Sequence, residues 1–133
     1  MNIVSFIAPC YNEESIIEEY YRRITKVADD NPNFEFEFIV VNDGSRDKSQ
    51  HILNQLADQD PRLKVIHFAA NRGHQSALFA GIENAKGDIN ISLDLDLQDP
   101  PELFYQFIEK INEGYDVVHA QRKHRPNENM FKL

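Results

Sequence analysis

The chain has 133 residues, which suits one domain built around one hydrophobic core. Its 41% hydrophobic and 27% charged residues are ordinary for a folded globular protein, and five Gly with six Pro exclude a low-complexity polymer. Fourteen basic and twenty-two acidic side chains give a formal net charge of -8, which repels nucleic acid and anionic lipid headgroups. We therefore expect no nucleic acid partner, and a phosphate-bearing ligand would need a cation at its site.

The sequence predicts a soluble, cytoplasmic chain. Cys10 is the single cysteine, so it cannot form an internal disulfide, and its apolar neighbours favour an inert buried thiol over a nucleophile. No window approaches the ~18 to 20 consecutive apolar residues of a membrane span, and the first residues lead into a strand-like run and not into a signal peptide. Residues 123–133 are expected to be a polar linker toward a missing segment.

Strands and helices are predicted to alternate from the first residues onward. An apolar run at 3–8 indicates a buried strand, which Pro9 is expected to stop. A helix should follow, with Asn12 as its N-cap and with apolar residues at helical spacing between Ile16 and Ala28.

The second strand is predicted at 34–41 and breaks at an Asn-Asp-Gly-Ser turn, 42–45. Ser45 or Asp47 can cap the next helix, which ends at Asp60. The remaining predicted elements are a strand at 63–68, a helix at 73–86 with Gly87 as C-cap, a strand at 89–93, a helix from Pro100 to Gly114 and a strand at 116–120.

This alternation predicts an α/β fold: a Rossmann-like, mostly parallel sheet with helices on both faces. In such sheets the ligand lies beyond the carboxyl ends of the strands. Each polar cluster alone is a weak signal, because turns rich in Asn, Asp and Gly are more often structural. Four such clusters are expected to converge on that edge, at 9–13, 42–45, 71–75 and 94–99.

Asp94 and Asp96 follow the fourth predicted strand with one residue between them. Alternation along an extended segment puts both carboxylates on the same side, where they repel unless a cation compensates. Hard oxygen ligands of this kind suit Mg²⁺ or Mn²⁺, and Gln98 could add a neutral oxygen. The alternative is helix capping, which explains Asp99 but not two carboxylates in register.

Glu13 and Asp43 follow the first two strands, where carboxylates can accept hydrogen bonds from ribose hydroxyls or a base N–H. Tyr11 offers a face for stacking. A structural reading stays equally open, with Glu13 as a first-turn helix acid and Tyr11 as a half-buried aromatic. No GxGxxG and no Walker motif follows any strand, which counts against NAD-dependent redox chemistry and P-loop phosphoryl transfer.

Two basic side chains stand near the same edge. Arg122 follows the fifth strand and could neutralise a diphosphate, although an arginine at this place can equally be solvated. His74 and Gln75 begin the third helix, whose N-terminus favours anions, and His74 is a weaker candidate for a catalytic base.

These motifs together resemble the inverting GT-A glycosyltransferases, specifically the polyprenyl-phosphate sugar transferases that include undecaprenyl-phosphate glucosyltransferases and dolichol-phosphate mannose synthases. The resemblance spans nearly the whole chain. Its landmarks are the segments 9–14 (PCYNEE), 41–45 (VNDGS), 71–75 (NRGHQ) and 94–102 (DLDLQDPPE). Asn42 and Leu95 depart from the family pattern, which more often has Asp and Ala there, and a bulkier Leu95 could narrow the nucleotide pocket.

The resemblance implies a GT-A domain over 1–122 that binds a nucleotide sugar. It places the backbone of residue 95 against the nucleotide, Asp94 and Asp96 on the diphosphate through the metal, Gln98 in the coordination sphere and Arg122 facing the diphosphate. The residues implied to surround the nucleoside are Pro9, Tyr11, Glu13, Val41 and Asp43.

The implied reaction moves a sugar, with inversion, from a nucleotide donor to a polyprenyl phosphate at the cytoplasmic face of the membrane. A UDP-sugar, such as a UDP-glucose-like donor, is favoured. Family members continue into an acceptor loop and hydrophobic helices, so this chain is expected to be the donor-binding portion of a longer enzyme. A nucleotidyltransferase-like protein or a catalytically degenerate nucleotide-binding module remains the alternative, and a homo-oligomer is compatible with the sequence.

Overall fold

The computed structural model describes residues 2–96, 104, 106, 117–120 and 131–132. Within them, one six-stranded sheet has the order β3-β2-β1-β4-β5-β6. Neighbouring strands run parallel, except that β6 is antiparallel to β5. The strands are β1 (Ile3–Cys10), β2 (Glu35–Asn42), β3 (Leu63–His67), β4 (Ile89–Ser92), β5 (Val117–Ala120) and β6 (Phe131–Lys132). The helices are α1 (Ile17–Asp29), α2 (Ser49–Gln59) and α3 (His74–Asn84).

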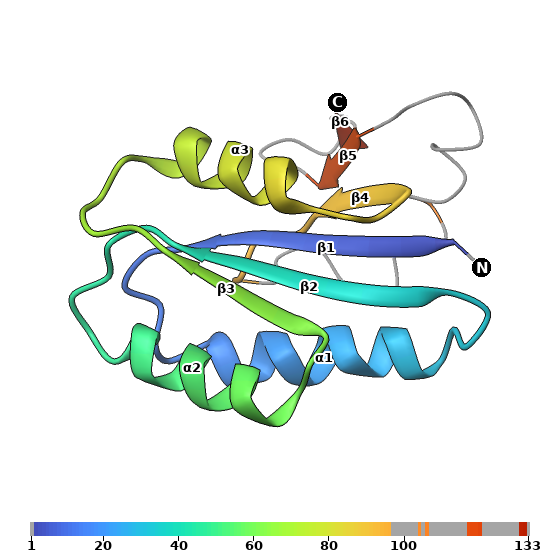
Figure 1. Ribbon diagram of the computed structural model, residues 1–133, viewed down its shortest axis with the longest axis horizontal. Helices are drawn as coiled ribbons and strands as arrows, with labels where there is room; N and C mark the ends of the chain where they lie inside the picture. Colours follow the sequence, from blue (N-terminus) through green and yellow to red (C-terminus); the bar gives the residue numbers. More distant parts are fainter. Residues whose placement is uncertain (1, 97–103, 105, 107–116, 121–130, 133) are drawn as a thin grey trace, which may run out of the picture.

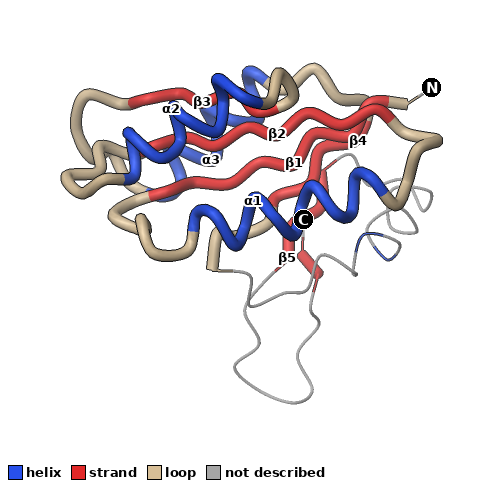
Figure 2. Tube along the Cα trace, turned by 90° about the horizontal axis from the view of Figure 1, so that it is seen from below, coloured by secondary structure: helices blue, strands red, loops and turns tan. Residues whose placement is uncertain are grey.

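The helices cover both faces of the sheet, as the alternation predicted (Figure 1). The larger core includes Phe6, Phe38 and residues of α1 and α2, whereas Ile7, Ile39 and Val41 pack with Ala77 of α3. Successive residues of one strand face opposite sides of the sheet, and both sides are covered here. Seven of the eight residues of β1 are therefore buried, and Figure 2 shows β1 between its parallel neighbours β2 and β4.

Pro9 does not stop the first strand, contrary to the prediction, and β1 continues to Cys10. Pairing with β4 ends where Ile7 meets Ser92, followed by a hydrogen bond from Leu93 N to Ile7 O. Because Pro9 lies two residues after Ile7, its missing N–H would face the side that β4 has already left. A proline is tolerated where no ladder donor is required.

The expected N-cap of the first helix is also wrong. The helix begins at Ile17 without a side-chain cap, and Asn12 has a φ of 52° in the preceding loop. Its side chain accepts a hydrogen bond from Arg46 N at 2.8 Å, so the side chain serves a contact between loops. Asp47 comes closer to its predicted role, because it accepts the amide of Ser49, the first residue of α2.

The third helix ends before the predicted glycine, with Ala85 at its C-cap. Gly87 instead donates its N–H to Ser5 Oγ, and an added Cβ at Gly87 would lie 2.4 Å from that oxygen. The predicted helix between Pro100 and Gly114 falls largely outside the described residues. β6 was not predicted and lies in the stretch expected to be a polar linker. Among the described residues, no helix is both long and apolar enough to cross a bilayer.

Candidate functional site

The candidate site lies where the strand order changes direction. β1 neighbours both β2 and β4, and the strand order continues to β3 beyond β2 and to β5 beyond β4. In open α/β sheets, ligands bind in the crevice beyond the carboxyl ends of the strands at such a point. The residues that follow β1 and β4 include Tyr11, Glu13 and Asp94, so the fold brings these candidates to one crevice.

The loops that follow β1 and β2 are tied to each other. Asn12 N donates to Ser45 Oγ at 2.9 Å, and Glu13 N donates to Ser49 Oγ at 3.2 Å. Gly44 has a φ of 72°, and a Cβ there would lie 2.4 Å from Asn71 N, so the turn requires glycine. This close approach connects the second loop to the loop after β3 and gives the edge a defined shape.

Asp43 is buried, and its carboxylate is occupied by the loop after β3. Its two oxygens accept hydrogen bonds from Arg72 N at 2.7 Å, Gly73 N at 3.0 Å and Asn71 Nδ2 at 3.1 Å. These donors hold the turn that leads into α3. The structure therefore gives Asp43 a supporting role beside the cavity, and the nucleoside contact implied by the resemblance stays a prediction.

Three carboxylates and one imidazole gather at the mouth of the crevice. Burial is the largest cause that raises the pKa of Glu13, and the charges of Asp96 and Asp94 raise it further, whereas a backbone hydrogen bond at Tyr11 and the neighbouring His74 oppose the shift. His74 Nε2 lies 3.6 Å from Asp94 Oδ1. These side chains therefore interact electrostatically at one place on the sheet edge.

The burial of residues 94–96 alternates as predicted, although residues 95 and 96 form a turn and not an extended segment. Asp94 and Asp96 reach solvent, whereas Leu95 between them is 2% exposed and belongs to the larger core. The bulk of Leu95 is therefore accommodated in the core and does not project into a cavity. Among the described residues, no three His, Cys, Asp or Glu side chains form a group that could hold a metal ion by themselves.

A cavity of about 260 Å³ is lined by most of the residues implied to surround the nucleoside. Val41 is not among them, because its side chain is fully buried beneath α3. Gln98 and Arg122 lie outside the described residues. The residues that line this cavity are Pro9, Cys10, Tyr11, Glu13, Asp43, Asn71, Gly73 and His74.

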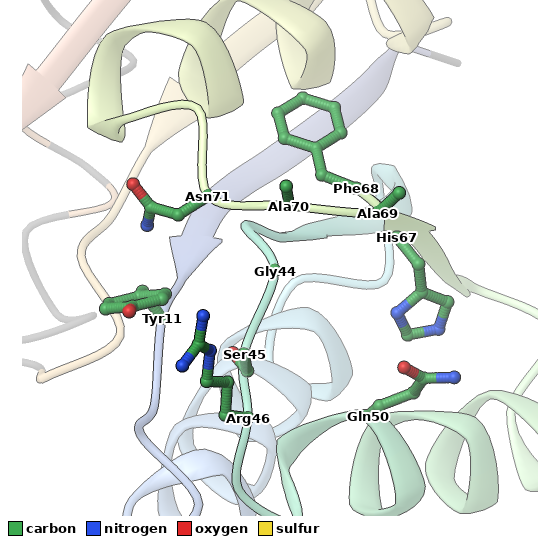
Figure 3. Close-up of a pocket in the computed structure, with 10 residues that line it drawn as sticks. All are labelled: Tyr11, Gly44, Ser45, Arg46, Gln50, His67, Phe68, Ala69, Ala70 and Asn71. Atoms are coloured by element: carbon green, nitrogen blue, oxygen red, sulfur yellow. The ribbon is translucent and has the colours of Figure 1, made fainter.

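A second cavity of about 420 Å³ shares Tyr11 and Asn71 with the first. Figure 3 shows the Tyr11 ring and the Arg46 side chain at one end of it, with His67 and Gln50 at the other. Tyr11 is 44% exposed, so a face of its ring is available to a planar ligand.

Sequence reasoning missed the polar contacts beneath the second cavity. Asn42 Nδ2 lies 3.0 Å from His67 Nδ1, and His67 Nε2 lies 2.8 Å from Asn54 Oδ1. Because Asn42 Oδ1 accepts the amide of Ser45, its Nδ2 donates to a neutral His67, whose pKa burial lowers. Asn42 thus anchors the turn, and only its departure from the family pattern could have signalled this.

Cys10 lines the first cavity but does not carry its chemistry. Its side chain is buried at the end of β1, and burial raises the pKa of its thiol to about 11. At neutral pH the thiol is therefore protonated and a poor nucleophile, as the sequence predicted.

The family model described as "Glycosyl transferase family 2" matches residues 5–132 of the chain. The chain belongs to glycosyl transferase family 2. An uncharacterised family 2 relative, glycosyltransferase YkcC of Bacillus subtilis (strain 168), is 47% identical over 96% of this chain and 39% of its own length. The bactoprenol glucosyl transferase of Shigella phage SfV is 39% identical over 97% of this chain and 42% of its own length. The chain spans about two fifths of the length of these curated relatives.

Solved structures of glycosyltransferases share the fold. S. aureus TarS 1-349 in complex with UDP has a TM-score of 0.67 and 25% identity, covering 97% of this chain and 38% of its own. Mannosyltransferase PcManGT from Pyrobaculum calidifontis, in complex with GDP-Man and Mn²⁺, has a TM-score of 0.62 and 25% identity, covering 79% of this chain and 38% of its own. These family 2 and structural matches confirm the predicted α/β, GT-A architecture.

Proposed function

We propose that this family 2 chain binds a nucleotide sugar, with UDP favoured as the nucleotide, for inverting transfer of the sugar to a polyprenyl phosphate. The observation that carries the proposal is the group of carboxylates Glu13, Asp94 and Asp96 beside a cavity at the switch point of the sheet. The names of a relative, a bactoprenol glucosyl transferase, and of a structural neighbour in complex with UDP support the acceptor and the nucleotide.

The side chains present fit a divalent cation, Mg²⁺ or Mn²⁺. Asp94 and Asp96 supply hard oxygen donors just after β4, and their charges act on Glu13 beside the cavity. Protein sites for Mg²⁺ commonly use one or two carboxylates together with substrate phosphates. We propose Gln98 as a further oxygen ligand. When bound, the cation stabilises the negative charge of the leaving diphosphate.

The chain's own residues position the donor. The exposed face of Tyr11 supports stacking on the base, and Glu13 lies beside the cavity where a carboxylate can accept from ribose hydroxyls. Asp43 keeps the α3 loop in place on the other wall. Arg122 is proposed to face the diphosphate and to neutralise charge that develops on it.

In the proposed reaction, an oxygen of the lipid phosphate forms a bond to the anomeric carbon as the bond from that carbon to the nucleoside diphosphate breaks. Attack from the opposite face inverts the configuration. A phosphate monoester is largely dianionic at neutral pH, because its second pKa is about 6, so the nucleophile needs little help from a base. The whole protein would act at the cytoplasmic face of the membrane, where it could also form a homo-oligomer.

Calorimetric titration tests the donor site. We expect UDP or UDP-glucose, rather than GDP or GDP-mannose, to bind in the presence of Mn²⁺, and EDTA to abolish binding. The variant carrying Asp94→Ala and Asp96→Ala should bind at least about 100-fold more weakly, a difference of about 2.7 kcal/mol. Metal-independent binding would contradict the cation site, and binding by a full-length protein without sugar transfer would favour a degenerate nucleotide-binding module.

A further inference from the structure

His74 is placed at the acidic group by buried parts of the fold. It is the first residue of α3, and this helix packs on the sheet through Ala77 and Gly81. A Cβ added at Gly81 would lie 2.4 Å from Ile7 Cγ2, so α3 lies unusually close to β1. The start of the helix is therefore fixed relative to the carboxyl end of β1.

The turn before His74 is also fixed, by hydrogen bonds to Asp43. Gly73, at the N-cap, has a φ of 101°, and its N–H donates to Asp43 at 3.0 Å. Arg72 N donates to the other oxygen of the same carboxylate at 2.7 Å. Since Asp43 is 3% exposed, these bonds are shielded from water and fix the backbone on which His74 stands.

The His74 side chain faces the carboxylate that leads the acidic pair. Its Nε2 lies 3.6 Å from Asp94 Oδ1, slightly beyond hydrogen-bond length, and both side chains are partly exposed and can rotate. Contacts of this kind often tighten only when a ligand binds.

We propose that His74 is a positioning residue for Asp94: its Nε2–H donates to the Asp94 carboxylate and holds it in the orientation that binds the cation of the donor complex. This inference rests on the proposed function. It differs from the earlier hypothesis of a catalytic base, because the ring nitrogen nearest the acidic group would donate to a carboxylate and not accept a proton from the substrate. Asp43 supports the arrangement through the turn at 71–73.

The expected effect is a weaker cation site with an intact fold. Partners that hydrogen-bond metal ligands typically change metal affinity by about 10- to 100-fold when removed. His74→Ala should therefore bind Mn²⁺ about 10-fold more weakly in the presence of UDP. His74→Gln, whose amide Nε2 can donate from a similar position, should recover most of this loss. Gln75→Ala, at the exposed next position of α3, should match the wild type.

Electron paramagnetic resonance of free Mn²⁺ measures this affinity directly, with the purified protein, UDP and each variant. Far-ultraviolet circular dichroism checks the fold of every variant. The result that supports the proposal is a loss in His74→Ala, rescue in His74→Gln and no change in Gln75→Ala. Wild-type affinity in His74→Ala would overturn it, and so would equal losses in both alanine variants, which would indicate a general effect on the helix.

The same titration separates this inference from the proposed function. If the wild type binds Mn²⁺ only with UDP and His74→Ala does so equally well, the donor site stands and the role of His74 is wrong. If the wild type binds no Mn²⁺ with UDP, with UDP-glucose or with GDP-mannose, both the donor site and the role of His74 are wrong.

Discussion

The carboxylates Glu37 and Glu13, near opposite ends of the parallel sheet, have pKa values shifted in opposite directions. At the amino end, Glu37 accepts hydrogen bonds from Lys64 Nζ at 2.6 Å, from Lys86 N at 2.8 Å and from the hydroxyl of Ser5. Burial by itself would raise the pKa of Glu37, but these three donors outweigh burial and lower it. The carboxylate is therefore fully compensated by the protein.

At the carboxyl end, the charges of Asp94 and Asp96 act on Glu13. Burial is the largest cause that raises the pKa of Glu13, and Asp96 and Asp94 raise it further. A backbone hydrogen bond at Tyr11 and the neighbouring His74 lower it, but the net shift is upward. A protein can lower this repulsion with its own donors, as it does around Glu37. The contrast teaches that donors from the chain outweigh burial at Glu37, whereas at Glu13 burial and the neighbouring carboxylates outweigh the donors.

Removal of the Glu37 charge should have the largest effect on stability. In Glu37→Gln the amide Nε2 cannot accept, so one buried donor loses its partner, and we expect the free energy of unfolding to fall by about 2 kcal/mol. The effect stays below that of a fully buried ion pair, because the Lys64 side chain is 47% exposed and can be solvated. Urea unfolding measures the difference.

Glu35→Gln is the matched control, because Glu35 begins the same strand and is exposed. It should unfold like the wild type. Both variants should bind UDP and Mn²⁺ normally, since the change lies at the far end of the sheet. An unchanged urea midpoint in Glu37→Gln would show that the amino end is not held by this carboxylate.

Asp43 lies at the carboxyl end of the sheet, but its carboxylate accepts hydrogen bonds from the chain, as the carboxylate of Glu37 does. Asp43→Asn replaces one accepting oxygen by a donor, so the amide of Arg72 or Gly73 loses its partner. We expect the free energy of unfolding to fall by about 1 to 2 kcal/mol, with weaker binding of UDP and Mn²⁺ as the α3 turn loosens. Thermal unfolding and calorimetry measure the two effects.

Asp58→Asn, on the exposed side of α2, is the control for replacing an aspartate and should change neither quantity. Loss of nucleotide binding in Asp43→Asn with wild-type stability would assign Asp43 to direct contact with the nucleoside. That outcome would remove it from the structural carboxylates.

The sequence predicted the parts of this contrast that depend on local periodicity. Alternation separated Asp94 and Asp96 from Leu95, and in the structure both aspartates reach solvent while Leu95 is buried. The alternation of apolar strands and helical stripes also predicted both covered faces of the sheet. These features need only the spacing of neighbouring residues.

The rest depends on partners that are distant in sequence. Glu37 lies in an alternating run, Glu35–Phe38. Its carboxylate is hydrogen-bonded in the buried state by donors that lie 27 and 49 residues away in the sequence. Asn12 has the residue type of an N-cap, but its partner lies 34 residues away. Asp43 was predicted beside the nucleoside, and its hydrogen bonds to the turn at 71–73 become visible only once β2 and β3 lie side by side.

The smallest expected effect is on the stability of Glu13→Gln, and it tests the repulsion that Glu13 experiences from Asp94 and Asp96. Because the pKa of Glu13 is raised in the folded state, its ionised form is less stable there than in the unfolded chain. Glu13→Gln should therefore be more stable than the wild type at pH 7 without metal, by less than about 1 kcal/mol. As the pH falls through the raised pKa to below the ordinary value of 4.5, the wild type takes up its proton and the difference should vanish. Thermal unfolding between pH 7 and pH 4 measures it.

At the other end of the sheet, ionisation of Glu37 should change the stability of the fold in the opposite direction. The lowered pKa of Glu37 stabilises the fold above the ordinary value of 4.5, and this contribution is lost as the pH falls through the lowered pKa. As the pH falls, the free energy of unfolding of both variants should therefore approach that of the wild type. It should start above the wild-type value for Glu13→Gln and below it for Glu37→Gln. Glu14→Gln, one residue beyond Glu13, controls for charge in the loop. A Glu13→Gln variant that is less stable than the wild type at pH 7 would mean that Glu13 is compensated after all, and the contrast between the two ends would fail.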